Sequence, residues 1–469
     1  MKKSGLTLVA AATLLLLIAA VWGLKTILDS PSADAPRGAV VILIDTLRPD
    51  HLSCYGYGRE TSPELSALAR EGVLFEKVVS AAPWTLPSVV SFFAGHRPNR
   101  EVFEQRLKRS LVAEIRDAGF TTAAFTEGGY VSAFFGLDLG FDSFVEEEGP
   151  VRLFIDGQAR QGSARGGIAR TFRLAREWLA TNGDENFFLF IHTYEPHVPY
   201  TRATFTKGLN PGKVGCPLTL ERLPLIREGK LVLDDVDLAY IEALYDGGIA
   251  EADRHVGEFV DYLEELGLRD DTLLVVTSDH GEELGAHYRA HTADHGHALL
   301  DEQILVPLII DNPCEKYAMK RIPHQVRLCD VMPTVAGILG VPTASGIDGA
   351  SLLPLMHGEE SKGRLADGGA TKAGPSRVFL RWLDYKYIRV IDSGGREEPL
   401  TPRPPAVQLY NLRADGGEKI NLSRKSPKIM RQMQKTLDSI VTARSSGETF
   451  VLPEDVDEAL RERLESLGY

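Results

Sequence analysis

The chain has 469 residues, of which 43% are hydrophobic, and it carries a formal net charge of −13. This length allows a large core, in one big domain or two. The sequence contains no basic stripe, so we expect no nucleic-acid partner. The cysteines show no CxxC spacing, which gives no support to a zinc ribbon or a thioredoxin motif. Cys314 and Cys329 could pair in an oxidising compartment, a question that the sequence leaves open.

The N-terminus resembles a membrane-directing segment. Lys2 and Lys3 precede an uncharged run over residues 6–24, which is about the length needed to cross a bilayer. A signal peptide is the alternative, but Pro36 after Ala35 would hinder cleavage there, so we favour an uncleaved anchor. The leading lysines place the main domain outside the cytoplasm, in the periplasm or at the cell surface, or secreted if the segment is cleaved.

Apolar runs and helical stretches alternate over the next 300 residues. We expect strands at 39–44, 73–79, 121–126, 186–191, 272–277 and 304–310, and helices at 62–72, 105–118, 168–181, 234–266 and 331–339. This alternation predicts an α/β fold, with a large, mostly parallel sheet covered by helices on both faces. We expect a surface excursion at 128–167, and a lid or specificity loop at 201–230.

The character of the chain changes after about residue 345. We expect a polar, Gly-rich loop at 359–376, strands at 377–382, 385–391 and 407–412, and helices at 425–441 and 453–467. The predicted organisation is an N-terminal segment with its linker (1–37), a catalytic α/β domain (38–345), a small α+β subdomain (346–445) and a helical tail (446–469).

Polar side chains stand at the ends of three of these segments. Asp45 follows the first strand, Asp279 and His280 follow a later one, and Thr85 stands where a loop enters an apolar helical run that stops at Gly95. A hydroxyl at a helix N-terminus faces unpaired amides, which favours an oxyanion and an anionic substrate. The alternative is that Thr85 is an ordinary N-cap. Two carboxylates, an imidazole and a hydroxyl suit a divalent metal, and zinc or manganese better than calcium.

Histidines are the second signal. Five of them fall between positions 280 and 297, directly after a candidate metal ligand: His280, His287, His291, His295 and His297. A solvated, His-rich loop is the alternative interpretation. His197 follows another strand end, where it could protonate a leaving group or hold a charged oxygen, unless it is a surface turn residue.

Several stretches together resemble the sulfatase family of the alkaline phosphatase superfamily. They are Ile44-Asp45-Thr46-Leu47-Arg48-Pro49-Asp50-His51-Leu52, Thr85-Leu86-Pro87-Ser88, Gly95-His96-Arg97-Pro98, Glu195-Pro196-His197-Val198-Pro199-Tyr200, Ser278-Asp279-His280-Gly281-Glu282-Glu283, Asp330-Val331-Met332-Pro333-Thr334 and Leu409-Tyr410-Asn411-Leu412. The resemblance covers residues 38–445. It implies a nucleophile at Thr85 and substrate contacts at His197 and His295, although His291 and His297 compete with His295. It also implies metal ligands at Asp45, Asp279 and His280, which join Thr85 in the proposed set.

The departures from this family decide the predicted chemistry. Family sulfatases carry Cys or Ser at position 85, which becomes formylglycine, and Arg at position 89; this chain has Thr85 and Val89. A threonine cannot give that aldehyde, so the hydrated-aldehyde route to sulfate is closed. Thr46 replaces the second Asp of the usual pair, which argues against calcium. A threonine nucleophile resembles instead the phosphodiesterases and phosphoethanolamine transferases of the superfamily, and implies in-line attack at phosphorus.

We therefore expect a metal-dependent hydrolase of phosphate- or phosphonate-type esters that acts outside the cytoplasm, with Thr85 as nucleophile. The expected partners are an anionic ester substrate, which a lipid or glycan could carry, and a membrane contacted by the N-terminal segment. Three alternatives stay open: a phosphoethanolamine-type transferase to a lipid or glycan, a sulfuric ester hydrolase with an unusual route, and a non-catalytic binding protein.

Overall fold

The computed structural model describes residues 35–97, 107–146, 152–155, 158–161, 167–219, 221–317, 320–369, 371–372, 374–392 and 403–445. The apolar segment at 6–24 and the tail helix at 453–467 lie outside these ranges. Within the described ranges, no helix is both long enough and apolar enough to span a bilayer.

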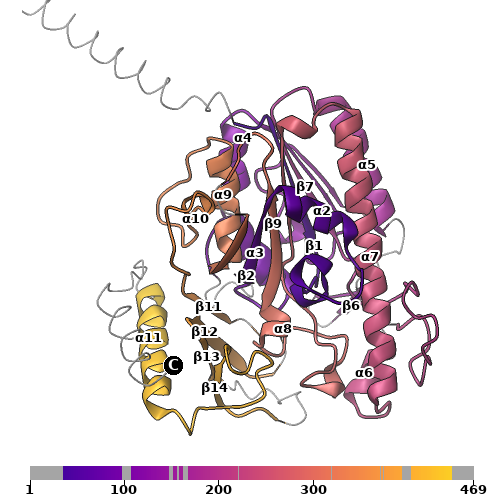
Figure 1. Ribbon diagram of the computed structural model, residues 1–469, viewed down its shortest axis with the longest axis vertical. Coiled ribbons are helices and arrows are strands. Elements are labelled where there is room, and N and C mark those ends of the chain that lie inside the picture. The colour runs from indigo at the N-terminus through magenta and orange to yellow at the C-terminus, as the bar shows by residue number, and fades with distance from the viewer. Residues whose placement is uncertain are drawn as a thin grey trace, which may run out of the picture.

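An eight-stranded sheet forms the centre of the molecule (Figure 1). Its strands run in the order β10-β2-β9-β8-β1-β7-β3-β4, and only β9 is antiparallel to its neighbours. The strands are β1 (Gly38–Ile44), β2 (Val73–Val79), β3 (Thr121–Thr126), β4 (Ser143–Glu146), β7 (Phe187–Thr193), β8 (Thr272–Thr277), β9 (Leu305–Asp311) and β10 (Arg321–Arg327). All six strands predicted for this region are present, which confirms the mostly parallel α/β fold.

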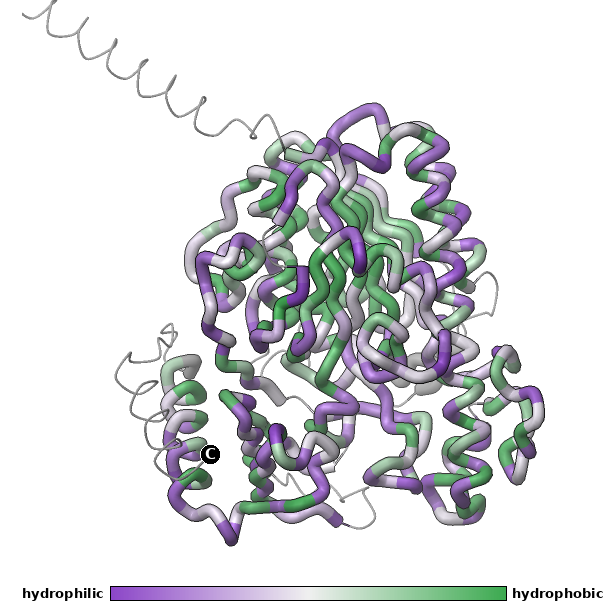
Figure 2. The backbone as a smooth tube through the Cα atoms, in the orientation of Figure 1, coloured by the Kyte–Doolittle hydropathy of each residue, from purple (hydrophilic) through white to green (hydrophobic). Residues whose placement is uncertain are grey.

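Helices cover both faces of this sheet. One face carries α3 (Thr85–Ala94), α4 (Leu111–Asp117) and α9 (Val331–Ile338), and the other carries α2 (Pro63–Glu71), α5 (Gly167–Asn182) and α7 (Asp235–Glu265). The side chains of β1 alternate between the two cores: Val41 and Leu43 enter one, and Val40 and Ile42 enter the other. Burial on both faces explains why the strand is a continuous apolar run, the green centre of Figure 2. Short helices α6 (Leu223–Arg227), α8 (Asp301–Ile304) and α10 (Leu353–Met356) lie in the connections.

A second, four-stranded antiparallel sheet forms the C-terminal subdomain. It contains β11 (Ala366–Gly369), β12 (Ser376–Trp382), β13 (Tyr385–Asp392) and β14 (Val407–Asn411), and α11 (Pro427–Ser445) packs against it. The two sheets meet where β11 touches the loop that precedes α3: the Gly369 amide donates to the Ala81 carbonyl at 2.9 Å. A Cβ on Gly368 would lie 2.0 Å from that same carbonyl oxygen, so only glycine allows this approach.

Three sequence predictions need correction. The segment 128–167 is not merely a surface excursion, because β4 extends the main sheet beside β3, and β5 (Arg152–Ile155) pairs with β6 (Gln158–Gln161). The loop predicted at 359–376 contains β11, whose sequence Ala-Asp-Gly-Gly has no strand propensity and which is held by pairing with β12. The helix predicted from residue 105 begins at Leu111, because the Ser110 side chain caps it by accepting from the Val112 amide.

The four cysteines are free thiols in this structure, so the pair considered between Cys314 and Cys329 is not formed. Cys329 is buried, and burial raises the pKa of its thiol to about 12. This thiol therefore stays protonated and behaves as a small apolar group.

Candidate active site

The sheet topology brings the predicted site residues to one edge. β1 lies between β7 and β8 and is parallel to both, so the carboxyl ends of these strands lie side by side. Asp45 follows β1 directly, and Asp279 and His280 follow β8 after a single residue. This is the edge at which open α/β sheets bind ligands.

Thr85 is the first residue of α3 and is almost fully buried, with 2% of its surface exposed. It is not the N-cap, which is Trp84, so the alternative of an ordinary capping role is wrong. Its hydroxyl instead donates to Asp45 Oδ2 at 3.2 Å and lies 3.3 Å from His280 Nε2. Ser88, one turn along α3, donates to the Asp279 carbonyl at 2.7 Å and fixes the helix against the β8 end of the site.

Asp45, Asp279 and His280 form a group whose ligand atoms all lie within 4.8 Å of one another. All three residues are fully buried. In the described part of the chain, Asp45 Oδ1 and Asp279 Oδ2 accept no hydrogen bond. Buried carboxylate oxygens without partners are costly, and a divalent cation between them would offset that cost. The donor set therefore fits a metal of the zinc or manganese type.

The surroundings of Asp45 disfavour its charged form. Burial raises the pKa of Asp45 well above its ordinary value, and the charges of Asp279 and Glu282 add to the effect. Asp279 Oδ1 is held in place by the amides of His280, at 2.9 Å, and Thr46, at 3.4 Å, so its other oxygen is the one that faces Asp45 and His280.

The orientation of His280 leaves one nitrogen ready to bind a cation. Its Nδ1 lies 2.8 Å from the Gly281 carbonyl oxygen, which can only accept, so Nδ1 carries the proton. Its Nε2 therefore presents a lone pair toward Thr85 and the carboxylates. Fixing a ligand histidine through its second nitrogen is how proteins orient metal-binding imidazoles.

His197 and His295 lie beside this group. The His295 ring stands 4.4 Å from the His280 ring and 5.0 Å from the His197 ring, measured between centroids. His295 Nδ1 lies 3.1 Å from Glu282 Oε1, and His197 Nδ1 donates to the Val198 carbonyl at 2.6 Å. Burial lowers the pKa of His197 to about 4 and that of His295 well below its ordinary value, so both rings are neutral at neutral pH.

The other histidines of the 280–297 segment point elsewhere. His291 and His297 stand on either side of Asp294, whose carboxylate also pairs with Arg227 at 2.6 Å. His287 lies between Glu302, at 2.7 Å, and the Gly417 carbonyl. Of the three candidates named from the sequence, His295 is the one whose ring lies beside His280, whereas His291 and His297 share the Asp294 carboxylate.

Sequence reasoning missed His192. This residue of β7 is fully buried, and its Nε2 lies 3.7 Å from Asp45 Oδ2. Neither of its ring nitrogens has a hydrogen-bond partner in the described structure, and burial lowers its pKa to about 3. An imidazole that interrupts the apolar run of β7 was the available signal.

The structure shows the surroundings of Thr46 and Val89, the two residues that depart from the family pattern beside Thr85. Thr46 adopts a left-handed φ of 58°, and its hydroxyl donates to the Asp45 carbonyl rather than turning toward the metal group. The Tyr245 hydroxyl holds the Thr46 carbonyl at 2.7 Å, which stabilises this uncommon backbone conformation. Val89 is fully buried in the core beneath α3.

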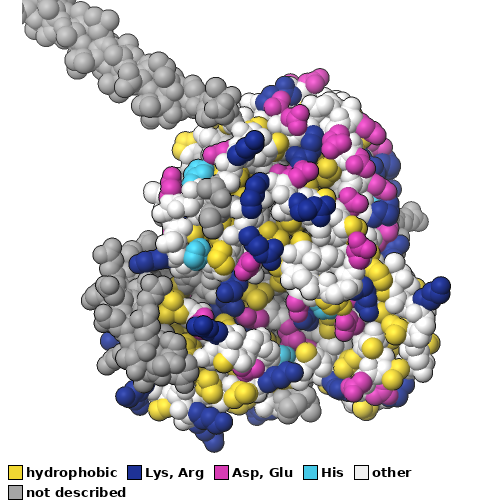
Figure 3. Space-filling model, in the orientation of Figure 1, with side chains coloured by type: hydrophobic (Ala, Val, Ile, Leu, Met, Phe, Trp, Pro, Cys, Tyr) yellow, Lys and Arg dark blue, Asp and Glu magenta, His cyan; other side chains and the backbone are white. Residues whose placement is uncertain are grey.

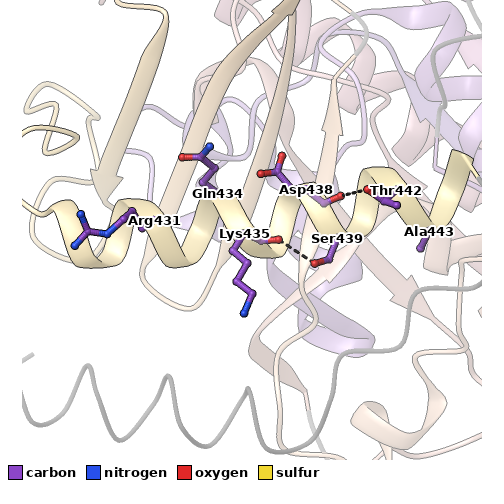
Figure 4. A pocket seen from close by; sticks show the side chains of 7 residues that line it. All are labelled: Arg431, Gln434, Lys435, Asp438, Ser439, Thr442 and Ala443. Atoms are coloured by element: carbon purple, nitrogen blue, oxygen red, sulfur yellow. Dashed lines mark hydrogen bonds between the residues drawn. The ribbon is translucent and has the colours of Figure 1, made fainter.

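A separate hollow of about 700 Å³ lies on α11 and offers no comparable chemistry (Figure 4). Its Ser439 and Thr442 hydroxyls donate to carbonyls of their own helix, and Asp438 pairs with Arg389 at 2.5 Å. Three of its polar side chains are therefore already engaged within the protein.

Comparison with known proteins agrees with this geometry. The sequence model named Sulfatase matches residues 38–341. The chain belongs to the sulfatase family. Membership places it among ester hydrolases, in accord with the predicted resemblance, and argues against the non-catalytic alternative. Enzymes of this superfamily generally use a divalent metal, which agrees with the buried Asp45–Asp279–His280 group.

Its relatives carry the names of esterases acting on sulfur and phosphorus. Arylsulfatase K of Xenopus laevis is 22% identical over 88% of this chain and 84% of the relative, and arylsulfatase K of Danio rerio is 30% identical over 44% and 38%. The chain thus spans well under half of the zebrafish protein. A multifunctional alkaline phosphatase superfamily protein, PehA of Trinickia caryophylli, is 26% identical over 68% of this chain and 77% of its own length.

Solved structures share the fold. A phosphonate monoester hydrolase of Agrobacterium radiobacter superposes with a TM-score of 0.64 and 18% identity, covering 88% of this chain and 96% of that one. A structure solved with its substrate D-glucosamine-2-N,6-O-disulfate gives a TM-score of 0.65 and 18% identity, covering 87% and 98%. At this identity the likeness supports the fold alone.

Proposed function

We propose that this chain is a metal-dependent hydrolase of phosphate- or phosphonate-type esters, with Thr85 as the nucleophile. The observation that carries the proposal is the Thr85 hydroxyl, which is buried at the start of α3 and donates to Asp45 while facing the His280 lone pair. A hydroxyl with an adjacent acceptor and no capping duty is arranged to lose its proton. The phosphonate monoester hydrolase among its structural neighbours agrees with the same fold hosting this chemistry.

A divalent cation held by Asp45, Asp279, His280 and Thr85 would lower the pKa of the hydroxyl and offset the negative charge of the ester. Zinc or manganese is proposed over calcium, because the set contains an imidazole and lacks a second carboxylate at Thr46.

In the first step, Thr85 Oγ1 forms a bond to phosphorus while the bond from phosphorus to the departing alcohol oxygen breaks. The hydroxyl proton passes to Asp45 Oδ2, which already accepts it at 3.2 Å. In the second step, a water oxygen forms a bond to phosphorus while the bond from phosphorus to Thr85 Oγ1 breaks, and the proton held by Asp45 returns to Oγ1. The proton that the water loses replaces the one that the departing alcohol takes from His197 Nε2.

His197 and His295 are proposed to manage the charge that develops on the leaving oxygen. His197 donates its Nδ1 proton to Val198, which leaves Nε2 to take a proton. Burial keeps this imidazole neutral in the free protein, and an anionic substrate beside it would raise its pKa and favour its protonation. Substrate identity and extracytoplasmic action remain predictions, the latter resting on residues 6–24.

The test is a side-by-side assay of purified protein loaded with zinc or with manganese. The substrates are p-nitrophenyl phosphate, a phosphodiester, a phosphonate ester and p-nitrophenyl sulfate. We expect turnover of a phosphorus ester, little turnover of sulfate, and a loss of about 10⁴-fold in Thr85→Ala. His291→Asn is the matched control, because it removes a histidine of the same segment outside the site.

Turnover of sulfate alone would contradict the proposal, as would turnover that survives in Thr85→Ala. A stable phosphothreonine that discharges only to an added alcohol or lipid would identify a transferase instead.

A further inference from the structure

The negative charge of the proposed substrate needs a counterpart at the site. An ester with a phosphoryl or sulfuryl group brings negative charge to a place that already holds Asp45 and Asp279. Position 89 on α3, where the family sulfatases carry an arginine, is a buried valine and brings no charge. A permanent cation from another part of the chain would balance this charge.

Lys372 is placed to supply it. This residue lies between β11 and β12, in the C-terminal subdomain, and its side chain is exposed. Its ammonium lies 5.5 Å from the centre of the Trp84 ring and 4.9 Å from that of Tyr130. The two rings meet edge to face, with centroids 5.4 Å apart. Trp84 directly precedes Thr85, so these contacts hold the ammonium beside the start of α3.

The backbone of Lys372 is also hydrogen-bonded to the segment that carries His295. Its amide donates to the Gly296 carbonyl at 2.6 Å, one residue beyond His295. A Cβ on Gly296 would lie 2.8 Å from Lys372 Cβ, and Gly296 has a left-handed φ of 82°. A glycine is therefore needed for the two segments to come this close.

The described contacts of the Lys372 ammonium are with the ring faces of Trp84 and Tyr130. Among the described residues, no acidic side chain forms an ion pair with Lys372.

We propose that Lys372 binds an anionic oxygen of the tetrahedral group that is transferred to Thr85, so that the C-terminal subdomain completes the substrate site. This inference rests on the proposed function for the identity of the ester. Lys372 is then a specificity-determining residue, held in place by the aromatic faces of Trp84 and Tyr130.

The test is a calorimetric titration of inorganic phosphate into the zinc-loaded full chain, which requires no turnover. We expect Lys372→Met to weaken phosphate binding by about 10-fold, because it removes the charge at nearly constant volume. Lys372→Arg should stay within about 3-fold of wild type. Lys428→Met, on the exposed face of α11, is the matched control for loss of one surface charge and should bind as wild type. A parallel titration with sulfate tells which oxyanion the site prefers.

Equal phosphate binding by wild type and Lys372→Met would overturn the inference, as would equal weakening in Lys428→Met or no phosphate binding by wild type. In turnover assays, Lys372→Met should raise KM and change kcat little, since the contact is made in the ground state and the transition state alike. If Lys372 governs phosphate binding while Thr85→Ala keeps full turnover, the Thr85 mechanism fails and the Lys372 assignment stands. If Thr85→Ala abolishes turnover and Lys372→Met binds phosphate as wild type does, the Thr85 mechanism stands and the Lys372 assignment fails.

Discussion

Two clusters of this protein each combine two carboxylates with one imidazole, and they differ in whether their aspartate oxygens have partners. The open cluster is Asp45, Asp279 and His280, and the closed cluster is His51, Glu242 and Asp246. In the closed cluster, Asp246 accepts from His51 at 2.7 Å and from Tyr57 at 2.8 Å, and it pairs with Arg59. Every Asp246 oxygen is therefore matched within the protein.

In the open cluster, one oxygen of each aspartate has no partner within the described residues. Composition alone does not distinguish a ligand site from a structural network. The two kinds of cluster are distinguished by whether the buried carboxylate oxygens have hydrogen-bond partners. Buried polar atoms in proteins are normally paired, so an unpaired oxygen indicates a place for another group. The surface charges give no comparable signal on the face seen in Figure 3, where basic and acidic side chains are interspersed.

The largest effect is expected from Asp279→Asn, which breaks the open cluster. The variant keeps an oxygen for the His280 amide but removes the charge that a cation would meet. Turnover should fall by about 10³-fold or more, with loss of bound metal measured by emission spectroscopy. The metal-free variant should be no less stable than the metal-free wild type, since Asp279 Oδ2 has no partner to lose. Full metal content in this variant would remove the distinction between the clusters.

Asp246→Ala should break the closed cluster with the opposite result. It leaves the buried His51 and the Arg59 guanidinium without their carboxylate, which should lower the free energy of unfolding by about 3–5 kcal/mol in denaturant titration. Metal content and turnover per folded molecule should be retained. Asp261→Ala, at an exposed position of the same helix α7, is the control and should change stability by less than about 0.5 kcal/mol. Loss of metal from folded Asp246→Ala would instead make it part of the site.

Glu127 is a buried carboxylate outside both clusters, and its substitution is expected to have a smaller effect than those of Asp279 and Asp246. Its carboxylate accepts from the Thr193 hydroxyl at 2.7 Å and the Tyr194 amide at 3.2 Å, and burial raises its pKa from 4.5 to about 7. The folded state therefore holds a proton that the unfolded state releases, so wild-type stability falls as the pH rises from 4.5 to 7. Glu127→Gln should remove this slope and gain on the order of 3 kcal/mol relative to wild type across that window. Parallel pH curves for the two proteins would show that Glu127 is ionised in the folded state.

The sequence by itself was enough to predict six strands of the main sheet and the candidate ligands at its edge. β1, β7 and β8 are buried on both faces, so each reads as an apolar run whose end is marked by the first polar residue. Because parallel strands present their carboxyl ends at one edge, Asp45 and Asp279 could be placed together before any coordinates were known. Strands without such a run were missed: β4 is a half-exposed edge strand, and β11 is rich in glycine.

Only the tertiary structure decided which side chains lie near Thr85. The 280–297 segment has no periodicity, and the direction of each histidine depends on partners elsewhere in the chain: His295 meets Glu282, whereas His297 meets Gln303. His192 and Lys372 reach the site from a neighbouring strand and from the second sheet, contacts that no local pattern encodes. Local sequence specifies an element through its own burial pattern, whereas the approach of distant side chains is set by how whole elements pack.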